Sequence, residues 1–414
     1  MSSTTISFAE TKAKLVGRNM PMRCVTLCAV GLAVLIPVAI AAHYGIYDSF
    51  VDSPTSGFAM WGTFIVYTAT RPRPKEMAAT LLLGLAMRLL YDLAIGERQY
   101  WGSILIAMGA FLGPASVIML AIQVVRIKTE RRAVIWRTLG VIAIFNYTSI
   151  CIGLYVNFAR VLLPDKLDHF LYAFDGSLGY EPSFMIAKLT RAWPLFYWLL
   201  EMVYYSLGFW FCVIYAAHAK AHGKFRFNIV HLFVTNFLIG YSLYFIFPAA
   251  GPGYAFPAFP DLPPVVKAGS VLLDCLPNAM PSLHLSSAIL IFWLSRPWKW
   301  LRAFTGVFCI LTALATLSTG EHYFVDLIVA VPYALAILAL ASDIRERHFL
   351  LLVGSVMVSA WLVVLRYGSI RPALSWMLVI VTIALCFKLE RRFARSLWNI
   401  ARGEPITTAA LPLN

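Results

Sequence analysis

The chain has 414 residues, of which 60% are hydrophobic and 13% are charged, and its formal net charge is +14. Because roughly a quarter of the residues in an ordinary soluble domain are charged, this composition excludes a soluble globular protein and indicates an integral membrane protein. Most of the basic residues lie in short links beside apolar stretches, where they would face anionic lipid head groups. Nucleic acid is therefore not an expected partner.

The apolar stretches predict an all-α, polytopic membrane protein with about 12 transmembrane helices. A helix needs roughly 20 apolar residues to cross a bilayer core. In chain order we expect spans at 24–46, 57–70, 77–94, 103–125, 139–159, 193–219, 228–247, 282–295, 301–318, 323–341, 349–365 and 371–387. The third span carries Arg88, which should face protein or reach an interface. If the second and third spans form a re-entrant pair, ten crossings remain.

The first span has an alternative interpretation, because Ala39 and Ala41 form an Ala-x-Ala triplet like that of a cleaved signal peptide. We expect a retained span, since the apolar run is longer than a signal h-region of about 7 to 15 residues. Lys and Arg concentrate in the N-terminal segment and in every second link. The positive-inside rule then predicts a multi-pass cell (inner) membrane protein with both termini in the cytoplasm.

Two links on the extracytoplasmic side are long. In the first, residues 160–192, apolar residues recur at helical spacing, which predicts an interfacial amphipathic helix ending near Gly176. These apolar positions are Leu167, Phe170, Leu171 and Phe174. The second link, residues 248–281, is rich in Pro and Gly and is expected to be a structured loop.

Two histidines begin predicted spans on this same face. His284 lies in "MPSLHLSS" and His322 in "GEHYFVDL". His322 and Asp326 are four residues apart, one helical turn, so the carboxylate could accept the ring N–H and leave the other ring nitrogen as a nucleophile or base. His284 could then act as a general acid. We therefore expect a catalytic site at the extracytoplasmic membrane face.

These two motifs resemble the second and third signature motifs of the type-2 phosphatidic acid phosphatase superfamily, and the branch they resemble most is inositol phosphorylceramide synthase. "FPAAGPGY" at 247–254 resembles the Phe-Pro-Ala-Ala-Pro-Pro-x-Tyr loop of that branch. The resemblance covers about residues 139–341, which would form a six-helix, phosphatase-like catalytic core. Residues 1–138 would be transmembrane helices outside this core, and residues 342–414 two C-terminal transmembrane helices with a basic cytoplasmic tail.

The resemblance implies phosphoryl transfer without a metal or another cofactor. His322 would attack phosphorus and form a phosphohistidine, Asp326 would orient His322, and His284 would protonate the departing oxygen. Ser282 lies where a helix begins, so it could bind phosphate oxygens or act as a plain N-cap.

The chain also departs from the family pattern. Thr316 stands where the phosphatase branch has an Arg, no Lys-and-Arg-Pro motif precedes the first long link, and Glu321 stands where the synthase branch tends to have another His. The phosphate charge therefore lacks its usual partners. The candidate substrate-binding residues are Lys267, Lys188, Arg191 and Tyr254, with Arg160 as a further cation. Each of these cations could instead anchor lipid head groups.

We expect a membrane-embedded phosphotransferase that moves a phosphoryl-bearing, phosphoinositol-like head group between a membrane lipid, such as a sphingolipid, and a hydroxyl acceptor. The alternative is a phosphatase of lipid phosphates or polyprenyl (pyro)phosphates, in which water is the acceptor. A transporter or flippase is a third possibility, although transporters usually show repeated halves with sites at the bilayer midplane. The oligomeric state stays open.

Overall fold

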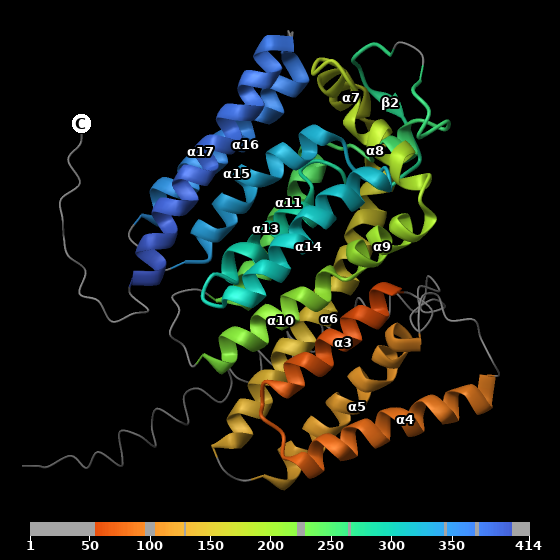
Figure 1. The fold of residues 1–414 in the computed structure, drawn as a ribbon, viewed down its shortest axis with the longest axis vertical. Helices are drawn as coiled ribbons and strands as arrows, with labels where there is room; N and C mark the ends of the chain where they lie inside the picture. The colour runs from red at the N-terminus through yellow and green to blue at the C-terminus, as the bar shows by residue number, and fades with distance from the viewer. Residues whose placement is uncertain are drawn as a thin grey trace, which may run out of the picture. The chain divides into compact units, whose positions relative to one another are not determined.

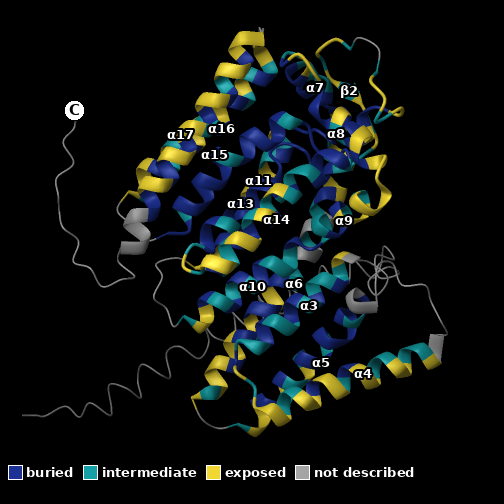
Figure 2. Ribbon diagram, in the orientation of Figure 1, coloured by how far each residue is buried: buried dark blue, intermediate teal, exposed yellow. Residues whose placement is uncertain are grey.

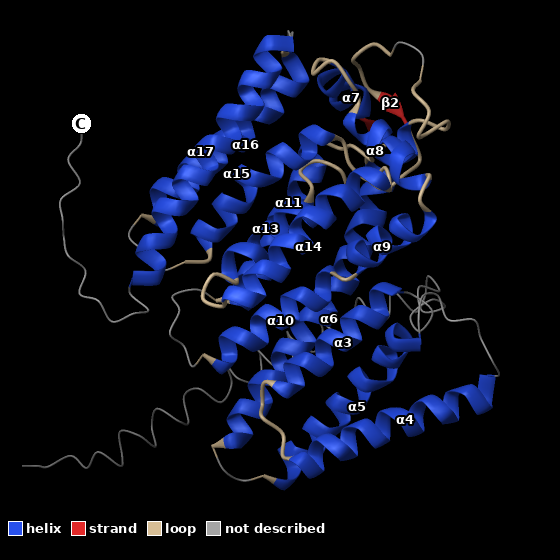
Figure 3. Cartoon of the chain, viewed as in Figure 1, coloured by secondary structure: helices blue, strands red, loops and turns tan. Residues whose placement is uncertain are grey.

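The computed structural model describes residues 54–95, 104–127, 130–221, 228–263, 266–342, 346–368 and 372–399. The first predicted span, 24–46, lies outside these residues. The described part is almost entirely helical, in agreement with the expected all-α class (Figures 1 and 3). In chain order its helices are α3 (Pro54–Thr68), α4 (Pro74–Ile95), α5 (Ile104–Arg126), α6 (Arg131–Leu162), α7 (Asp168–Gly176), α8 (Pro182–Arg191), α9 (Pro194–Tyr205), α10 (Leu207–Lys220), α11 (Ile229–Ile246), α12 (Pro252–Ala255), α13 (Leu283–Leu294), α14 (Lys299–Ser318), α15 (Phe324–Leu340), α16 (Arg347–Tyr367) and α17 (Pro372–Asn399).

Five helices in the described part are long and apolar enough to cross a membrane, and a bent pair would make a sixth. They comprise Ala107–Arg126, Ile229–Ile246, Lys299–Ser318, Arg347–Tyr367 and Pro372–Ala394. These helices support a multi-pass membrane protein, and the expected count of about 12 spans is not confirmed by the described residues. Two of the remaining apolar helices, α13 and α15, are shorter than a span.

Helix α5 packs against both α3 and α4, and α3 also packs on α10. The basic side chain of Arg88 in α4 contacts other residues of the protein. Its guanidinium forms an ion pair with Asp92 at 2.6 Å, one turn further along the helix, and lies 5.6 Å from the ring centroid of Phe111. This agrees with the expectation that Arg88 faces protein.

The predicted span at 193–219 is not one straight helix. α9 and α10 meet at Ser206 with a bend of 53°. The Ser206 hydroxyl donates a hydrogen bond to the carbonyl oxygen of Val203 at 2.8 Å, a side-chain bond that competes with the regular helix pattern. The bend directs the end of α9 towards the candidate site described below.

Helix α15 is largely enclosed, with fourteen of its 17 residues buried (Figure 2). It packs against α7, α11, α13, α16 and α17. A helix that is apolar on all sides is expected to be buried in this way. Close packing with α16 depends on Gly354, because a Cβ there would lie 2.9 Å from both the Ala336 side chain and the Pro332 carbonyl oxygen. The middle of α15 is therefore packed closely against α16.

The first long link contains the predicted helix, but its apolar face packs on protein. Helix α7 ends at Gly176 as expected, and Leu171 and Phe174 are buried. The Phe174 ring lies 5.3 Å from the ring of Trp361 in α16, so this apolar residue contacts protein. A second helix in the link, α8, begins at Pro182 and was not predicted; it packs against α9 and α14.

The second long link is mostly loop, as expected. It contains the four-residue helix α12 and the strand β2 (Val271–Leu272), which pairs antiparallel with β1 (Asp165–Lys166) from the first link. The loop also lies directly against the "GEHYFVDL" segment, because the N–H of Gly253 donates to the carbonyl oxygen of Gly320 at 2.9 Å. The two long links and the third motif therefore meet at one end of α15.

Candidate active site

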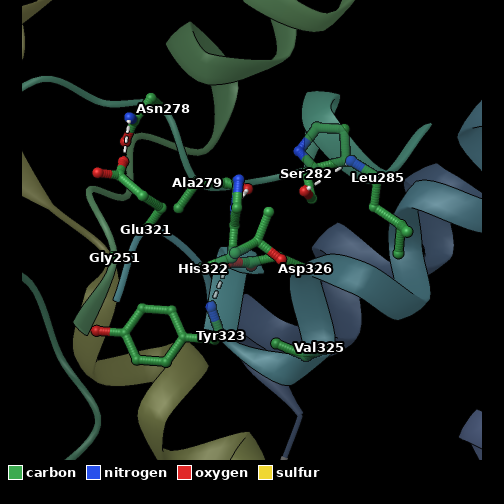
Figure 4. Close-up of polar contacts among 12 residues, drawn as sticks. Gly251, Asn278, Ala279, Ser282, Leu285, Glu321, His322, Tyr323, Val325 and Asp326 are labelled. Atoms are coloured by element: carbon green, nitrogen blue, oxygen red, sulfur yellow. Dashed lines mark hydrogen bonds and ion pairs between the residues drawn. The ribbon is translucent and has the colours of Figure 1, made fainter. Parts of the chain in front are cut away.

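His322 precedes α15 and is almost completely buried, with 1% of its surface exposed. Its Nδ1 lies 2.9 Å from the carbonyl oxygen of Ala279 (Figure 4). Because a carbonyl oxygen can only accept a hydrogen bond, Nδ1 must carry the proton, and the neutral ring keeps its lone pair on Nε2. Burial lowers the pKa of His322 to about 4, although the charge of Glu321 and the Ala279 bond oppose this shift. The ring is therefore neutral at pH 7.

The sequence predicts that Asp326 accepts the ring N–H of His322, but in the structure it does not. Its Oδ2 lies 3.6 Å from His322 Nδ1, beyond hydrogen-bond distance, and accepts the backbone N–H of Tyr323 at 2.8 Å. This bond caps the first turn of α15. In a capping box, the side chain of the third helical residue accepts the backbone N–H of the residue directly before the helix. The other oxygen, Oδ1, is buried and has no hydrogen-bond partner within the described ranges. The carboxylate thus lies beside the imidazole with one oxygen unused.

The structure brings His284 close to His322, as the topology predicts. The two ring centroids lie 6.3 Å apart, and His284 is partly exposed whereas His322 is not. The ring of Tyr204 stacks on His284 with a centroid distance of 3.8 Å and an interplanar angle of 18°. Tyr204 comes from the last turn of α9, directly before the bend, and sequence reasoning missed it. The stacking restrains the orientation of the His284 ring.

Ser282 is a buried N-cap of α13. Its Oγ accepts the N–H of Leu285 at 3.3 Å, and its own backbone N–H donates to the carbonyl oxygen of Asp326 at 3.3 Å. The N-cap role considered for Ser282 is therefore present. The second of these bonds links the first turn of α13 to that of α15, and so fixes the positions of the two motifs relative to each other.

A buried carboxylate of α7 caps the helix that follows His322. Asp175 accepts the backbone N–H groups of Phe324 at 2.7 Å and Val325 at 3.1 Å. These are among the first N–H groups of α15, which have no partner inside the helix. Burial raises the pKa of Asp175 well above its ordinary value. Asp175 therefore positions the start of α15, and with it His322, through the backbone.

A second carboxylate of α7 joins the Pro- and Gly-rich loop to the third motif. Asp168 accepts the N–H groups of Ala250 at 3.0 Å and Gly251 at 2.8 Å, and the Tyr323 hydroxyl at 3.1 Å. Burial raises the pKa of Asp168 to about 6 in spite of these bonds. Sequence reasoning missed both carboxylates of α7.

Glu321, the residue before His322, contacts two side chains of the second long link. Its Oε1 accepts a hydrogen bond from the Tyr254 hydroxyl at 2.7 Å. Its Oε2 accepts one from the Asn278 amide at 3.0 Å (Figure 4). The structure thus places the predicted binding residue Tyr254 beside the histidine motif. Asn278 is a further residue that sequence reasoning missed.

Two of the basic residues proposed from the sequence have partners of their own. Lys188 forms an ion pair with Asp261 at 3.0 Å, in which both side chains are 72% exposed. Arg191 donates to the carbonyl oxygen of Phe259 at 3.3 Å, and its guanidinium lies 5.1 Å from the centroid of that ring. Neither contact involves a residue of the two histidine motifs.

The other basic residues of the two long links are Arg160, Lys267 and Lys166. Arg160 forms a two-pronged ion pair with Asp274, with N–O distances of 2.6 and 2.7 Å. Lys267 is exposed. Lys166, which was not proposed, is fully buried and donates to the carbonyl oxygen of Leu163, and burial lowers its pKa. No contact described here joins these cations to the two histidines.

Comparison with known families supports the class of chemistry that this site indicates. Residues 169–340 match the family model described as the PAP2 superfamily. The matched segment contains His284, His322 and Asp326, and the match indicates a phosphatase or phosphotransferase of lipid phosphates. It gives no support to the inositol phosphorylceramide synthase branch in particular. No curated protein and no solved structure matches the chain.

Proposed function

We propose that the chain is a membrane-embedded phosphotransferase that moves a phosphoryl-bearing head group from a lipid to a hydroxyl acceptor, through a phosphohistidine at His322. The observation that carries this proposal is the hydrogen bond between His322 Nδ1 and the Ala279 carbonyl oxygen at 2.9 Å. It leaves a neutral ring with its lone pair on Nε2, which is the form that can attack phosphorus.

In the first step, Nε2 of His322 forms a bond to phosphorus, and the bond from phosphorus to the lipid oxygen breaks. His284, whose ring centroid lies 6.3 Å from that of His322, would donate its proton to this oxygen. Reacting atoms approach to about 3–3.5 Å in a productive complex, so the spacing leaves room for a phosphoryl group between the rings. Tyr204 would keep His284 in the orientation that this proton transfer needs.

The phosphorylated His322 ring carries a positive charge, which Asp326 is placed to stabilise. Its Oδ2 lies 3.6 Å from Nδ1, and its Oδ1 has no partner in the described structure. Opposite charges at this separation attract strongly in a buried site. In the second step, the acceptor hydroxyl attacks phosphorus and gives its proton to His284, and His322 is released neutral.

We place the site on the extracytoplasmic face of the membrane and both termini in the cytoplasm, as the distribution of basic residues suggests. We retain Ser282 and Tyr254 as substrate contacts, together with the cations Lys267, Lys188 and Arg191. The chemistry uses a nitrogen nucleophile and a proton donor, and the proposal includes no metal or other cofactor.

Transfer and hydrolysis share the first step and differ in the acceptor. To separate them, the purified full chain would be incubated with a mixture of membrane lipids labelled at phosphorus, and the labelled products identified by mass spectrometry. We expect label in a new phosphoester that is formed by the wild type and not by His322→Gln. Label that appears only as free phosphate would identify a phosphatase and contradict the transferase.

A further inference from the structure

We propose that Glu321, Tyr254 and Asn278, here called the Glu321 cluster, form a subsite for the hydroxyl groups of the head group that is bonded to the reacting phosphorus. This inference rests on the proposed function of His322. It assigns a role to Glu321, a position at which the chain departs from the family that it resembles.

The Glu321 cluster has hydrogen-bond acceptors that the protein does not use. The Asn278 amide must turn its NH2 group towards Glu321, because a carboxylate only accepts hydrogen bonds. Its Oδ1 therefore points elsewhere, and this atom is buried without a partner among the residues that the structure describes. The carboxylate oxygens can accept bonds beyond those from Tyr254 and Asn278. The cluster can therefore accept hydrogen bonds from donor groups of a ligand.

The backbone around the Glu321 cluster is arranged for close approach. Gly251 and Gly320 have φ values of +105° and +79°, which favour glycine. A Cβ at Gly251 would lie 2.4 Å from the carbonyl oxygen of Glu321, and a Cβ at Gly320 would lie 2.9 Å from Gly253. Only glycines permit these contacts, and they bring the loop that carries Tyr254 onto Glu321. The backbone conformation at these glycines therefore holds the residues of the cluster together.

The chemistry of the Glu321 cluster fits hydroxyl groups and does not fit a phosphate. Phosphate oxygens carry negative charge and would be repelled by the carboxylate, whereas an O–H group can donate to it. An ammonium group could also donate. We favour hydroxyls for two reasons. One of the unused acceptors is the neutral amide oxygen of Asn278. In addition, the hydrogen bonds from Tyr254 and Asn278 already offset part of the negative charge of Glu321.

The position of the Glu321 cluster agrees with this assignment. Figure 4 shows Glu321 and Asn278 on one side of His322 and Ser282 on the other. The lipid oxygen that leaves would lie towards His284, which follows Ser282 in α13. The substituent of phosphorus that does not leave, the head group, would then extend towards Glu321.

The test measures equilibrium binding of three phosphate monoesters to the full chain carrying His322→Gln, which prevents turnover. Glycerol 1-phosphate and propyl phosphate differ in their hydroxyl groups, and ethanolamine phosphate presents an ammonium group instead. We expect glycerol 1-phosphate to bind roughly tenfold or more tightly than propyl phosphate, since hydrogen bonds to charged groups have about this effect. Adding Glu321→Ala should remove this preference, while propyl phosphate should bind at least as tightly as before because the carboxylate that repels its phosphate is gone. Retained binding of propyl phosphate also shows that the site is folded.

The matched control is Glu346→Gln, an exposed residue next to α16 at the other end of α15, which should leave all three affinities unchanged. Equal binding of glycerol 1-phosphate and propyl phosphate, no binding of any of the three ligands, or a preference that survives Glu321→Ala would overturn the subsite. A preference for ethanolamine phosphate that Glu321→Ala removes would overturn the hydroxyl assignment. Failure of the proposed function is a separate result: the hydroxyl preference would be present, but the wild type would form no phosphohistidine.

Discussion

The carbonyl oxygen of Ala279 accepts the Nδ1–H of His322 at 2.9 Å, so the loop before one histidine motif sets the tautomer of the histidine in the other. Asp326, the residue expected to do this, instead closes the first turn of α15. The site therefore depends on how two loops pack together as well as on its ionisable side chains. A change that moves the loop at Ala279 should affect His322 as strongly as a change in Asp326.

The roles of the two histidines can be separated with a substrate whose leaving group needs no proton. His322→Gln removes the nucleophile and should abolish turnover of both the natural lipid and a nitrophenyl phosphodiester. His284→Gln removes the proton donor of the first step and the base of the second, each worth about 10² to 10⁴-fold. It should lose the lipid reaction but still release nitrophenol from the activated ester in a first turnover, because that leaving group needs no proton. If His284→Gln releases no more nitrophenol than His322→Gln in this first turnover, the assigned roles are wrong.

The pH dependence should report the low pKa of His322. Protonation of Nε2 removes the nucleophile, and burial lowers the pKa of this ring to about 4. An ordinary histidine titrates near 6.5. With His284→Gln, which removes the other imidazole of the site, the rate of nitrophenol release in the first turnover should stay constant from neutral pH down to about 5 and fall only as the pH approaches the pKa of His322. A loss of activity centred near an ordinary histidine pKa would contradict this account.

Asp175 should contribute to both stability and activity. Asp175→Ala leaves the N–H groups of Phe324 and Val325 without their acceptor, which should lower the free energy of unfolding by about 1–3 kcal/mol. Asp175→Asn keeps one acceptor oxygen and should have a smaller effect. The control is Asp165→Ala, an exposed carboxylate in β1. Thermal unfolding in detergent would measure these differences, and equal stability of Asp175→Ala and the control would show that the cap is unimportant.

Activity should persist after metal removal. The proposed steps use the imidazoles of His322 and His284, and the charge that develops on His322 is balanced by Asp326. Initial rates of lipid turnover in the presence and absence of EDTA should therefore agree. Complete loss with EDTA, restored by Mg²⁺, would show that the reaction depends on a bound cation.

Several features of the site could be predicted from the sequence. His284 and His322 begin neighbouring apolar helices, and the alternation of spans places both on one face of the membrane, so their approach follows from topology. The end of α7 at Gly176 follows from apolar spacing and a terminal glycine. The burial of Asp168 and Asp175 could also be predicted from the sequence, because both lie on the same face of α7 as its buried apolar residues.

Other features leave little trace in a sequence. The Ala279 carbonyl acts through the backbone, and every residue has such a group. The bend at Ser206 is not visible in hydropathy, because the residues on both sides are apolar. The nearby Ser206 and Gly208 were its only sequence signal, since Gly and Ser pairs often mark kinks. Without the bend, the stacking of Tyr204 on His284 could not be predicted.

The central claim is that His322 becomes covalently phosphorylated, and trapping this species tests it most directly. His284→Gln would be incubated with the nitrophenyl phosphodiester, quenched at alkaline pH and digested, and the peptides would be sequenced by mass spectrometry. We predict a phosphoester-bearing group on His322, absent from the variant that also carries His322→Gln. Turnover of the same substrate with no modification at His322, or with the group on another residue, would contradict the account.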